Sequence, residues 1–362
     1  MKAYIVEKAD LEQNLRILQR KAGKALIWGV LKGNGYGLGT VPLARLLAAH
    51  GIDHFAVTEL QEARGLREAG FSENPILMLR GVSEMEELDA LLDLNVILTI
   101  GSWADAMAME AAAERRATVA EAHLKIDTGM GRYGFLPEEM EQAISLYERL
   151  SHVAISGVYT HFHTAGNRKR TTAQFSLFLQ AVDRIRAAGY ETGMVHCCNS
   201  IAFWKYPEMH CDAVRLGSTL LGRVHTGGRA GLHRIGWAEA TVEELRTLPK
   251  GHNVGYGGDC KLKRETRVAI VGVGYFHGFS VERGYDVYRF QDCLRGIGRY
   301  VKYLLQRKAL WVQIGGRSCR VLGHVGMVNL AVDVSAVSCQ LGDPVILQIN
   351  PLDLKGMEVV YR

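Results

Sequence analysis

Short apolar segments alternate with amphipathic segments along the N-terminal part of the chain. The first apolar segment, Ala25–Leu31 (ALIWGVL), has no charge and is followed by turn residues, which predicts a buried strand. Thr40–Gly51 has apolar residues at helical spacing and ends on glycine, a stop signal. Further strands are predicted at His54–Val57, Ile76–Leu79, Val96–Ile100, Ala122–Ile126, Ile155–His161, Met194–Cys198 and Ala213–Leu216. Further helices are predicted at Glu59–Ala69, Met85–Leu92, Ala104–Glu114, Pro137–Leu150 and Thr172–Ala188.

Eight strands that alternate with helices over about 200 residues predict a closed (β/α)8 barrel of the TIM type. The pattern changes at Thr226–Gly231 (TGGRAG), which we interpret as a linker. Beyond it, short β-rich runs predict a mostly β domain with one helix within Asp292–Gln306. These runs are Val268–Val273, Ala309–Ile314, Arg320–Val325, Leu330–Val334 and Pro344–Leu347. We therefore expect a barrel over residues 1–230 and a mostly β domain over 231–362. The first strand, Ala3–Val6, is a candidate to pack with the second domain.

Composition indicates a soluble globular protein: 48% of the residues are hydrophobic and 22% are charged. The formal net charge of +5 is modest and basic residues are interspersed with acidic ones, so we expect no nucleic-acid partner. Seven cysteines without a repeating spacing favour a reducing compartment over a disulfide framework. The polar start MKAYIVEKADLEQN and the lack of any apolar run near 18 residues predict a cytoplasmic protein with no membrane partner.

Lys32 ends the first predicted strand and precedes the glycine-rich turn Gly33–Gly37. A lysine fixed by a rigid strand and partly desolvated has a lowered pKa, which makes its amine the nucleophile needed for a Schiff base. The alternative from this stretch alone is a lysine that extends to solvent from a strand end.

Further polar residues fall at the C-terminal ends of the predicted strands, where barrel enzymes hold their active sites. Besides Lys32 they are Lys125, Arg132, His161, Asn199, Ser200, Arg215, Gly217 and Ser218. Each has a structural explanation when taken alone, such as a helix N-cap for Ser200, but their placement at one rim predicts a site. The set suits an aldehyde cofactor that carries a phosphate: Lys32 would form the imine, and Ser200 with the backbone N–H groups of Gly217 and Ser218 would bind the phosphate. Tyr36 adds a hydroxyl donor.

These segments resemble those of a known family. VLKGNGYGLG is similar to the lysine motif of the alanine racemases, which are fold-type III pyridoxal-phosphate enzymes. Further similar motifs occur in order along the chain: LKIDTGMGRYGF, GVYTHFHTA, VHCCNS, DAVRLGSTLLG, NVGYGGD, VGVGYFHG and GHVGMVN.

The resemblance implies a role for each matching residue. Lys32 would be the Schiff-base lysine and one catalytic base, and Tyr256 the second base, supplied by the other subunit of a head-to-tail homodimer. Arg215 would face the pyridine nitrogen of pyridoxal 5′-phosphate, and His161 would orient the cofactor. The other implied roles are a phosphate cradle (Tyr36, Ser200, Gly217, Ser218), the cofactor phenolate and substrate carboxylate (Arg132), the entrance and substrate carboxylate site across the dimer (Tyr275, Met327) and a carbamylated lysine (Lys125). Asn199 is expected among the cofactor-binding residues. No metal is implied.

The sequence departs from the family in the substrate region. The last motif reads Gly326-Met327-Val328, with His324 where arginine is common, and the usual Asn-Tyr pair is missing. Asn350 is the nearest equivalent, and its amide would leave room for a hydroxymethyl group. Phe276–Asp286 also differs from the family's acidic-glycine pattern. Serine or broad-specificity racemisation therefore stays open beside alanine racemisation, since one such group changes binding by only about 1–3 kcal/mol.

Three alternative functions fit parts of the sequence. His161 and His163 on one strand face are compatible with a metal-dependent barrel hydrolase, although no spaced second pair accompanies them. A non-catalytic pyridoxal-phosphate carrier would share the barrel but end after it. Amino-acid decarboxylases of the same fold type would need a cysteine and an aspartate in the second domain, and neither Cys260 nor Cys293 lies in a matching motif.

Overall fold

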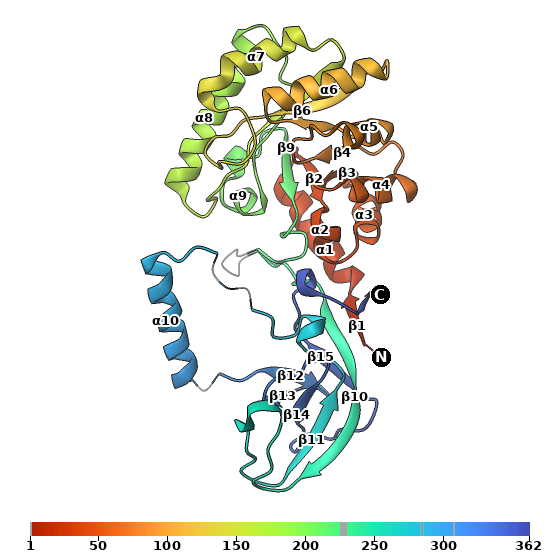
Figure 1. Cartoon of the computed structure of the whole chain (residues 1–362), viewed down its shortest axis with the longest axis vertical. Helices are drawn as coiled ribbons and strands as arrows, with labels where there is room; N and C mark the ends of the chain where they lie inside the picture. Colours follow the sequence, from red (N-terminus) through yellow and green to blue (C-terminus); the bar gives the residue numbers. More distant parts are fainter. Residues whose placement is uncertain (1, 225–229, 283, 285, 307) are drawn as a thin grey trace. The chain divides into compact units, whose positions relative to one another are not determined.

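The computed structural model describes residues 2–224, 230–282, 284, 286–306 and 308–362. The chain divides into two compact units (Figure 1): Lys8–Ile235 forms one, and Met1–Glu7 together with Gly236–Arg362 forms the other. Residues 226–229 of the predicted linker lie outside the described part of the chain.

The unit Lys8–Ile235 is a closed barrel of eight parallel strands, as the sequence predicts. Its strands are β2 (Leu26–Val30), β3 (His54–Val57), β4 (Ile76–Met78), β5 (Leu98–Ile100), β6 (Ala120–Lys125), β7 (Val153–Tyr159), β8 (Met194–His196) and β9 (Ala213–Leu216). Their order is β4-β3-β2-β9-β8-β7-β6-β5. The ring closes between β4 and β5, because the Met78 N–H donates to the Ile97 carbonyl at 2.9 Å and the Ile97 N–H to the Ile76 carbonyl at 2.8 Å.

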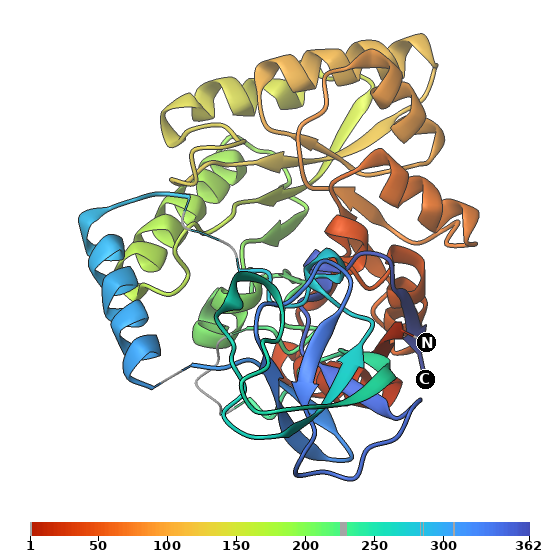
Figure 2. The ribbon, with the colours of Figure 1, turned by 60° about the horizontal axis from the view of Figure 1, so that its bottom comes forward.

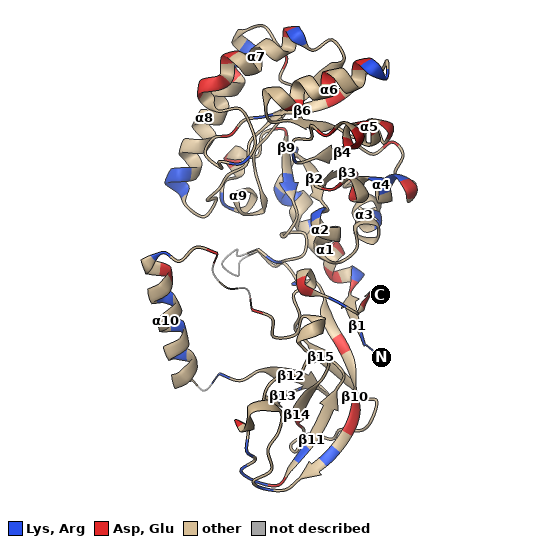
Figure 3. Cartoon of the chain, in the orientation of Figure 1, with Lys and Arg blue, Asp and Glu red and all other residues tan. Residues whose placement is uncertain are grey.

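Helices surround the barrel strands, as Figure 2 shows from below. They are α1 (Lys8–Ala22), α2 (Lys32–Tyr36), α3 (Thr40–Ala49), α4 (Leu60–Glu68), α5 (Met85–Asp93), α6 (Trp103–Arg115), α7 (Met140–Arg149), α8 (Arg168–Ala187) and α9 (Ser200–Lys205). Two 3-10 turns accompany them, η1 (Pro137–Glu139) and η2 (Pro207–Met209). Most Lys, Arg, Asp and Glu residues of this unit belong to the helices and loops (Figure 3), so the apolar faces of the helices are left for packing on the strands.

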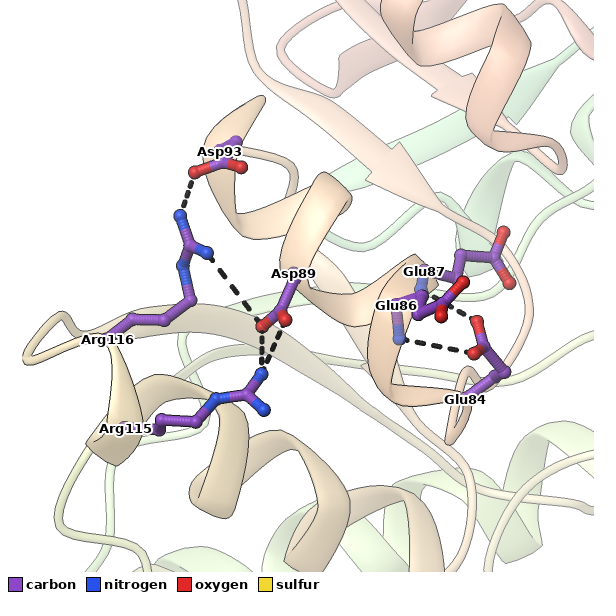
Figure 4. Close-up of polar contacts among 7 residues, drawn as sticks. All are labelled: Glu84, Glu86, Glu87, Asp89, Asp93, Arg115 and Arg116. Atoms are coloured by element: carbon purple, nitrogen blue, oxygen red, sulfur yellow. Dashed lines mark hydrogen bonds and ion pairs between the residues drawn. The ribbon is translucent and has the colours of Figure 1, made fainter.

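The pair α5 and α6 illustrates how the outer layer is fixed (Figure 4). The Glu84 carboxylate caps α5 by accepting hydrogen bonds from the backbone N–H groups of its first turn. Arg115 at the end of α6 donates to both carboxylate oxygens of Asp89 at 2.5 Å. An exposed ion pair of this kind adds about 0–1 kcal/mol, whereas burying Leu88 and Leu91 adds about 1.5–3 kcal/mol each. Packing therefore contributes more to stability than the ion pair does.

The second unit is built on a mostly antiparallel sheet. Its strands are β1 (Lys2–Val6), β10 (Trp237–Leu248), β11 (Thr266–Val271), β12 (Trp311–Ile314), β13 (Arg317–Leu322), β14 (Leu330–Asp333), β15 (Pro344–Leu347) and β16 (Glu358–Tyr361). Strand β10 pairs with β15 through its first half and with β11 through its second half, across a bulge between Val242 and Glu244. Together with the β11-β14-β13-β12-β15 pairings, this closes a ring of strands that covers its own edges.

The remaining elements of this unit lie in its connections. The turns are η3 (Tyr256–Gly258), η4 (Tyr275–His277) and η5 (Pro351–Asp353), and the helix α10 (Phe290–Leu305) precedes β12. The opening strand β1 pairs antiparallel with β10 and parallel with β16, so it belongs to the sheet of the second unit. The chain therefore starts in one unit, builds the barrel and then returns.

Candidate active site

A cavity of about 400 Å³ lies at the C-terminal ends of the barrel strands. Ten of the residues singled out from the sequence line it: Lys32, Tyr36, Lys125, Arg132, His161, Asn199, Ser200, Arg215, Gly217 and Ser218. Residues that the sequence reasoning missed also line it, among them Thr58, Glu59, Arg80, Tyr133 and Tyr159. Tyr159 could have been found, because it precedes His161 by two residues and alternate residues of a strand share a face.

Strand β2 delivers Lys32 to this cavity, and an unusual turn follows. Gly33, Asn34, Gly35 and Tyr36 all have φ between 54° and 65°, in the left-handed region that glycine enters at little cost. The buried carboxylate of Glu62 on α4 holds the turn: its Oε1 accepts from the Asn34 N–H at 3.0 Å. Glu62 is therefore a structural part of the site that no motif indicated.

The two lysines of the cavity have lowered pKa values. Burial lowers the pKa of Lys32, and the positive charge of Arg132 lowers it further, while Glu62 opposes the change. Burial lowers the pKa of Lys125 to about 7, and the charges of Arg215 and Arg132 act in the same direction. Each lysine is thus drawn toward its neutral amine form, which is the nucleophilic and proton-accepting form.

Arg132 is positioned by the loop after β6. The Asp127 carboxylate accepts the backbone N–H of Arg132 at 3.0 Å and those of Gly129 and Met130 at 2.8 and 2.6 Å. The Lys125 ammonium lies 5.2 Å from the ring centre of Tyr133, next to Arg132. A single carboxylate therefore fixes the loop that brings Arg132 to the cavity.

Arg215 on β9 is buried, and its hydrogen-bond partners are neutral. Its guanidinium donates to the Thr160 carbonyl at 2.6 Å and to His196 Nδ1 at 2.7 Å. Across the residues that the structure describes, Arg215 forms no ion pair. Because Arg215 can only donate, His196 Nδ1 is the acceptor, so its Nε2 carries the proton and donates to His123 Nδ1 at 2.9 Å. Burial and the nearby Arg215 charge lower the pKa of both histidines, to about 3 for His123, so both stay neutral.

A small cradle lies beside Gly217. Ser200 Oγ accepts the backbone N–H groups of Gly217 and Thr219 at 3.3 and 3.4 Å. A Cβ at Gly217 would overlap the Tyr36 hydroxyl, so only glycine lets that hydroxyl approach the backbone this closely. Burial raises the pKa of Tyr36 to about 12, which keeps its hydroxyl protonated as a donor.

Four predicted site residues lie in the second unit instead of the barrel. Tyr256, Tyr275 and Met327 are exposed, with Tyr256 at 76%. The turn of Tyr275 lies against the last motif, since its N–H donates to the Gly326 carbonyl at 3.1 Å. Asn350 Nδ2 donates to the Asp353 carboxylate at 3.0 Å and its Oδ1 caps the following turn, so its amide is engaged locally.

The histidine pair behind the metal alternative does not build a centre. His161 lines the cavity and the pKa of its ring is held well below the usual value by burial and by Arg215, whereas His163 is exposed. Within the described ranges, no group of three or more His, Cys, Asp or Glu side chains is arranged to hold a metal ion. The metal-dependent alternative therefore gains no support.

The fold and site define a two-unit barrel protein whose cavity is lined by lysines and arginines. The sequence matches the alanine racemase N-terminal domain over residues 6–225 and the alanine racemase C-terminal domain over residues 237–356. The chain belongs to the alanine racemase family.

Individual relatives agree with this assignment. The alanine racemase of Desulforamulus reducens is 32% identical over 96% of this chain and 90% of its own length. The alanine racemase of Methylacidiphilum infernorum is 31% identical over 94% of this chain and 82% of its own. Among solved structures, an alanine racemase of Clostridium difficile 630 aligns with a TM-score of 0.85 at 24% identity, over 100% of this chain and 95% of that one. This last similarity concerns the fold.

Proposed function

We propose that the chain is a pyridoxal-phosphate-dependent alanine racemase that interconverts L-alanine and D-alanine. One observation carries the proposal: the Lys32 amine lines a cavity of about 400 Å³, where burial and the positive charge of Arg132 lower its pKa. The volume lies in the range of small-molecule sites. Family membership and the similarity to named alanine racemases support the same reaction.

The residues of the cavity fit an aldehyde cofactor with a phosphate. Five basic side chains line the described cavity against one acidic residue, Glu59, so the cavity favours an anionic ligand. We assign Tyr36, Asn199, Ser200, Gly217 and Ser218 to the phosphate, since all five line the cavity and the Tyr36 hydroxyl lies against Gly217.

The other cavity residues are assigned to the ring and its linkage. Lys32 would hold the aldehyde and His161 would orient the ring. Arg215 is buried, and its hydrogen-bond partners among the described residues are neutral. It would face the pyridine nitrogen and disfavour protonation of that nitrogen, because two positive charges would then lie side by side. Arg132 would bind the cofactor phenolate and the substrate carboxylate.

Racemisation needs proton transfer at both faces of the substrate Cα. Pyridoxal phosphate, when bound, supplies an aldehyde that joins the substrate amine and withdraws electrons, which acidifies the α-hydrogen. Lys32 Nζ exchanges the proton on one face, and its lowered pKa favours the neutral amine, which is the form that accepts a proton. Tyr256 exchanges the proton on the other face. Arg132 anchors the carboxylate, so that only the α-hydrogen changes sides.

The second base comes from a partner in this proposal. Tyr256, Tyr275 and Met327 all expose large side chains on the second unit, a pattern typical of surfaces that a partner covers. We propose a cytoplasmic homodimer in which the partner's Tyr256 completes each barrel cavity, with Tyr275, Met327 and Asn350 at the entrance and substrate pocket. We also propose that Lys125 is carbamylated, because a pKa of about 7 leaves much of its amine neutral and reactive toward CO₂.

An assay of purified, cofactor-loaded protein on L- and D-alanine and on L-serine tests the function. We expect alanine to be racemised fastest, with activity lost in Lys32→Ala together with the absorbance of the lysine-bound cofactor. Faster turnover of serine would favour the serine alternative. An active Lys32→Ala variant, or a cofactor-loaded protein that racemises none of these amino acids, would contradict the proposal, and the second outcome would favour a carrier.

A further inference from the structure

The helix α10 exposes its apolar side. Seven large apolar side chains of this helix are between 48% and 78% exposed: Phe290, Leu294, Ile297, Tyr300, Val301, Leu304 and Leu305. Its buried positions are the polar Asp292 and the small Gly296. A helix of a globular protein normally turns its apolar stripe inward. Here the stripe is exposed, and in Figure 1 the helix lies apart from the strands of its own unit.

The two faces of α10 are sharply separated. At 100° per residue, the seven apolar side chains and Cys293 fall within an arc of roughly 140°. The basic residues Arg295, Arg299 and Lys302 fall on the opposite side, where Asp292 is paired with Arg289 and Arg295. Such a helix has one side suited to an apolar phase and one suited to water and anions.

The segment around α10 has a local excess of positive charge (Figure 3). Residues 287–308 hold six basic residues and one acidic residue, so this stretch alone accounts for the whole formal excess of +5. Basic residues are interspersed with acidic ones along the chain, and this stretch departs from that pattern. A basic amphipathic helix is typical of segments that bind membrane surfaces.

We propose that α10 docks on an anionic lipid surface, with its apolar stripe inserted among the acyl chains and its basic face toward the headgroups. Sixteen residues give a helix about 24 Å long, which suits a helix that lies in the interface. No described helix combines the length and hydropathy needed to cross a bilayer. The expectation of no membrane partner was drawn from run length, a criterion that detects spanning helices only.

Charge argues for lipid over a second copy of the chain on the same face. A second copy of α10 packed stripe against stripe would cover the apolar side but would add no negative charge for the opposite side, on which Arg295 and Lys302 lie. An anionic bilayer supplies the opposite charge and the apolar phase together. It also accounts for two glycines in the helix, Gly296 and Gly298, because docking compensates for a low intrinsic helix propensity.

Co-sedimentation of the full chain with vesicles tests the proposal. We expect binding to phosphatidylcholine vesicles that contain about 30% phosphatidylglycerol, and at least tenfold weaker binding to phosphatidylcholine alone at about 0.1 M salt. The double substitution Ile297→Ser and Leu304→Ser removes apolar side chains from the exposed stripe and should weaken binding at least tenfold. Lys302→Glu should weaken binding to the anionic vesicles. Gln306→Ser, an exposed polar position at the end of the same helix, is the matched control and should bind like the parent.

Each contrary result is distinct. Failure of the parent chain to sediment with anionic vesicles overturns the proposal. Binding that survives the Ile297/Leu304 substitutions but disappears in salt shows simple electrostatic adsorption and also overturns insertion. If the same substitutions instead dissociate a larger assembly in size-exclusion chromatography without affecting vesicle binding, a protein surface covers the stripe and the proposal is wrong. Circular dichroism and gel filtration of every variant separate these outcomes from misfolding, and none of them depends on racemase activity.

Discussion

At the scale of single residues, the cavity is governed by cations held close together. Lys125 is nearly buried, and the positive charges of Arg215 and Arg132 act on it together with Lys32. Each charge raises the cost of protonating its neighbours, so the amines become neutral at a lower pH than in water. The neighbouring cations in the cavity must therefore also destabilise the folded protein when no anion is bound.

The substitution Lys125→Met should expose this cost. Between the folded pKa of about 7 and the ordinary value of 10.5, the folded protein binds fewer protons than the unfolded chain, so wild-type stability rises with pH across that window. Below pH 7 both states are protonated and the full cost remains. We expect Lys125→Met to be more stable by roughly 1–4 kcal/mol at pH 6, with the difference shrinking toward pH 10.

Urea unfolding of cofactor-free protein in CO₂-free buffer measures this difference. Lys169→Met, at an exposed position of α8, is the matched control and should show no such pH dependence. An equal effect of Lys125→Met at pH 6 and pH 10 would mean that Lys125 does not change its protonation between them, which contradicts the argument.

Gly217 gives a second prediction, on cofactor binding. Because a Cβ there would overlap the Tyr36 hydroxyl, Gly217→Ala must displace the Tyr36 ring or fill the proposed phosphate cradle. We expect at least tenfold weaker binding of pyridoxal phosphate, measured by absorbance titration. Gly166→Ala, where nothing lies within 4 Å of the added Cβ, should bind normally. Unchanged affinity in a folded Gly217→Ala protein would place the phosphate elsewhere.

The cavity residues that could be predicted from the sequence are those at the ends of the barrel strands. Lys32, Lys125 and Arg215 lie at or beside strand ends, and the shared polarity of a barrel brings such positions to one rim. Glu62 could not be predicted in the same way. Its role depends on α4 approaching the turn after β2, a contact between segments 28 residues apart that leaves no local pattern. The relay from Arg215 through His196 to His123 is likewise set by the closed barrel.

At the scale of elements, Glu62 links helix α4 to the turn that follows β2 at Lys32. Its Oε2 accepts the N–H groups of Thr58 and Glu59 at 2.9 and 3.2 Å and so caps α4, while Oε1 holds the turn at Asn34. The two oxygens thus have separate tasks. A substitution that changes one oxygen can separate the capping of the helix from the positioning of Lys32.

The substitution Glu62→Gln replaces one carboxylate oxygen with an NH₂ group and so separates the capping of α4 from the positioning of Lys32. The amide oxygen can keep the two N–H groups of the cap, and the amide NH₂ then faces the Asn34 N–H, which loses its acceptor. We expect a loss of about 1–3 kcal/mol, faster hydrogen exchange at residues 33–38, and lower racemase activity with α4 intact. Glu68→Gln, exposed on the same helix, is the control. Unchanged exchange at 33–38 in Glu62→Gln would show that the turn is held by other contacts.

The elements missed from the sequence were missed for different physical reasons. The barrel strands were predicted closely because short apolar runs stand out between charged helices. The helix α1 was not predicted, although Leu11, Leu15 and Leu18 are buried at helical spacing, since its many charged and polar residues hide the stripe. The long strand β10 alternates buried residues only in its first half, where it pairs with β15, and becomes exposed beyond the bulge. Tertiary pairing, rather than local pattern, defines it.

At the scale of the whole molecule, the proposed reaction requires more than one chain. Lys32 belongs to the barrel unit, and Tyr256 belongs to the second unit, where it is exposed. In a two-fold dimer, the second unit of each chain would complete the barrel cavity of the other chain. Each cavity would then hold one lysine and one tyrosine of the partner. In that arrangement each chain contributes one base to each of the two sites.

Mixing two inactive variants tests this arrangement. In Lys32→Ala and Tyr256→Phe homodimers every site lacks one base. In the mixed dimer, both lesions fall in one site and the other site is complete. Random exchange of equal amounts makes about half of the dimers mixed, so about a quarter of wild-type activity should return. Activity of each variant alone and of the mixture is measured after native mass spectrometry has verified subunit exchange.

The variant Tyr256→Phe also has an expected kinetic signature of its own, which is measured without mixing. Because each base serves one face of Cα, Tyr256→Phe should slow exchange of the α-hydrogen with solvent deuterium much more for one enantiomer than for the other. Tyr275→Phe, another exposed tyrosine of the second unit, is the matched control and should affect both enantiomers alike. No recovery in verified mixed dimers would place both bases in one chain. Symmetric, mild losses in Tyr256→Phe would remove the phenol from proton transfer, and the second unit would then serve only to close the cavity.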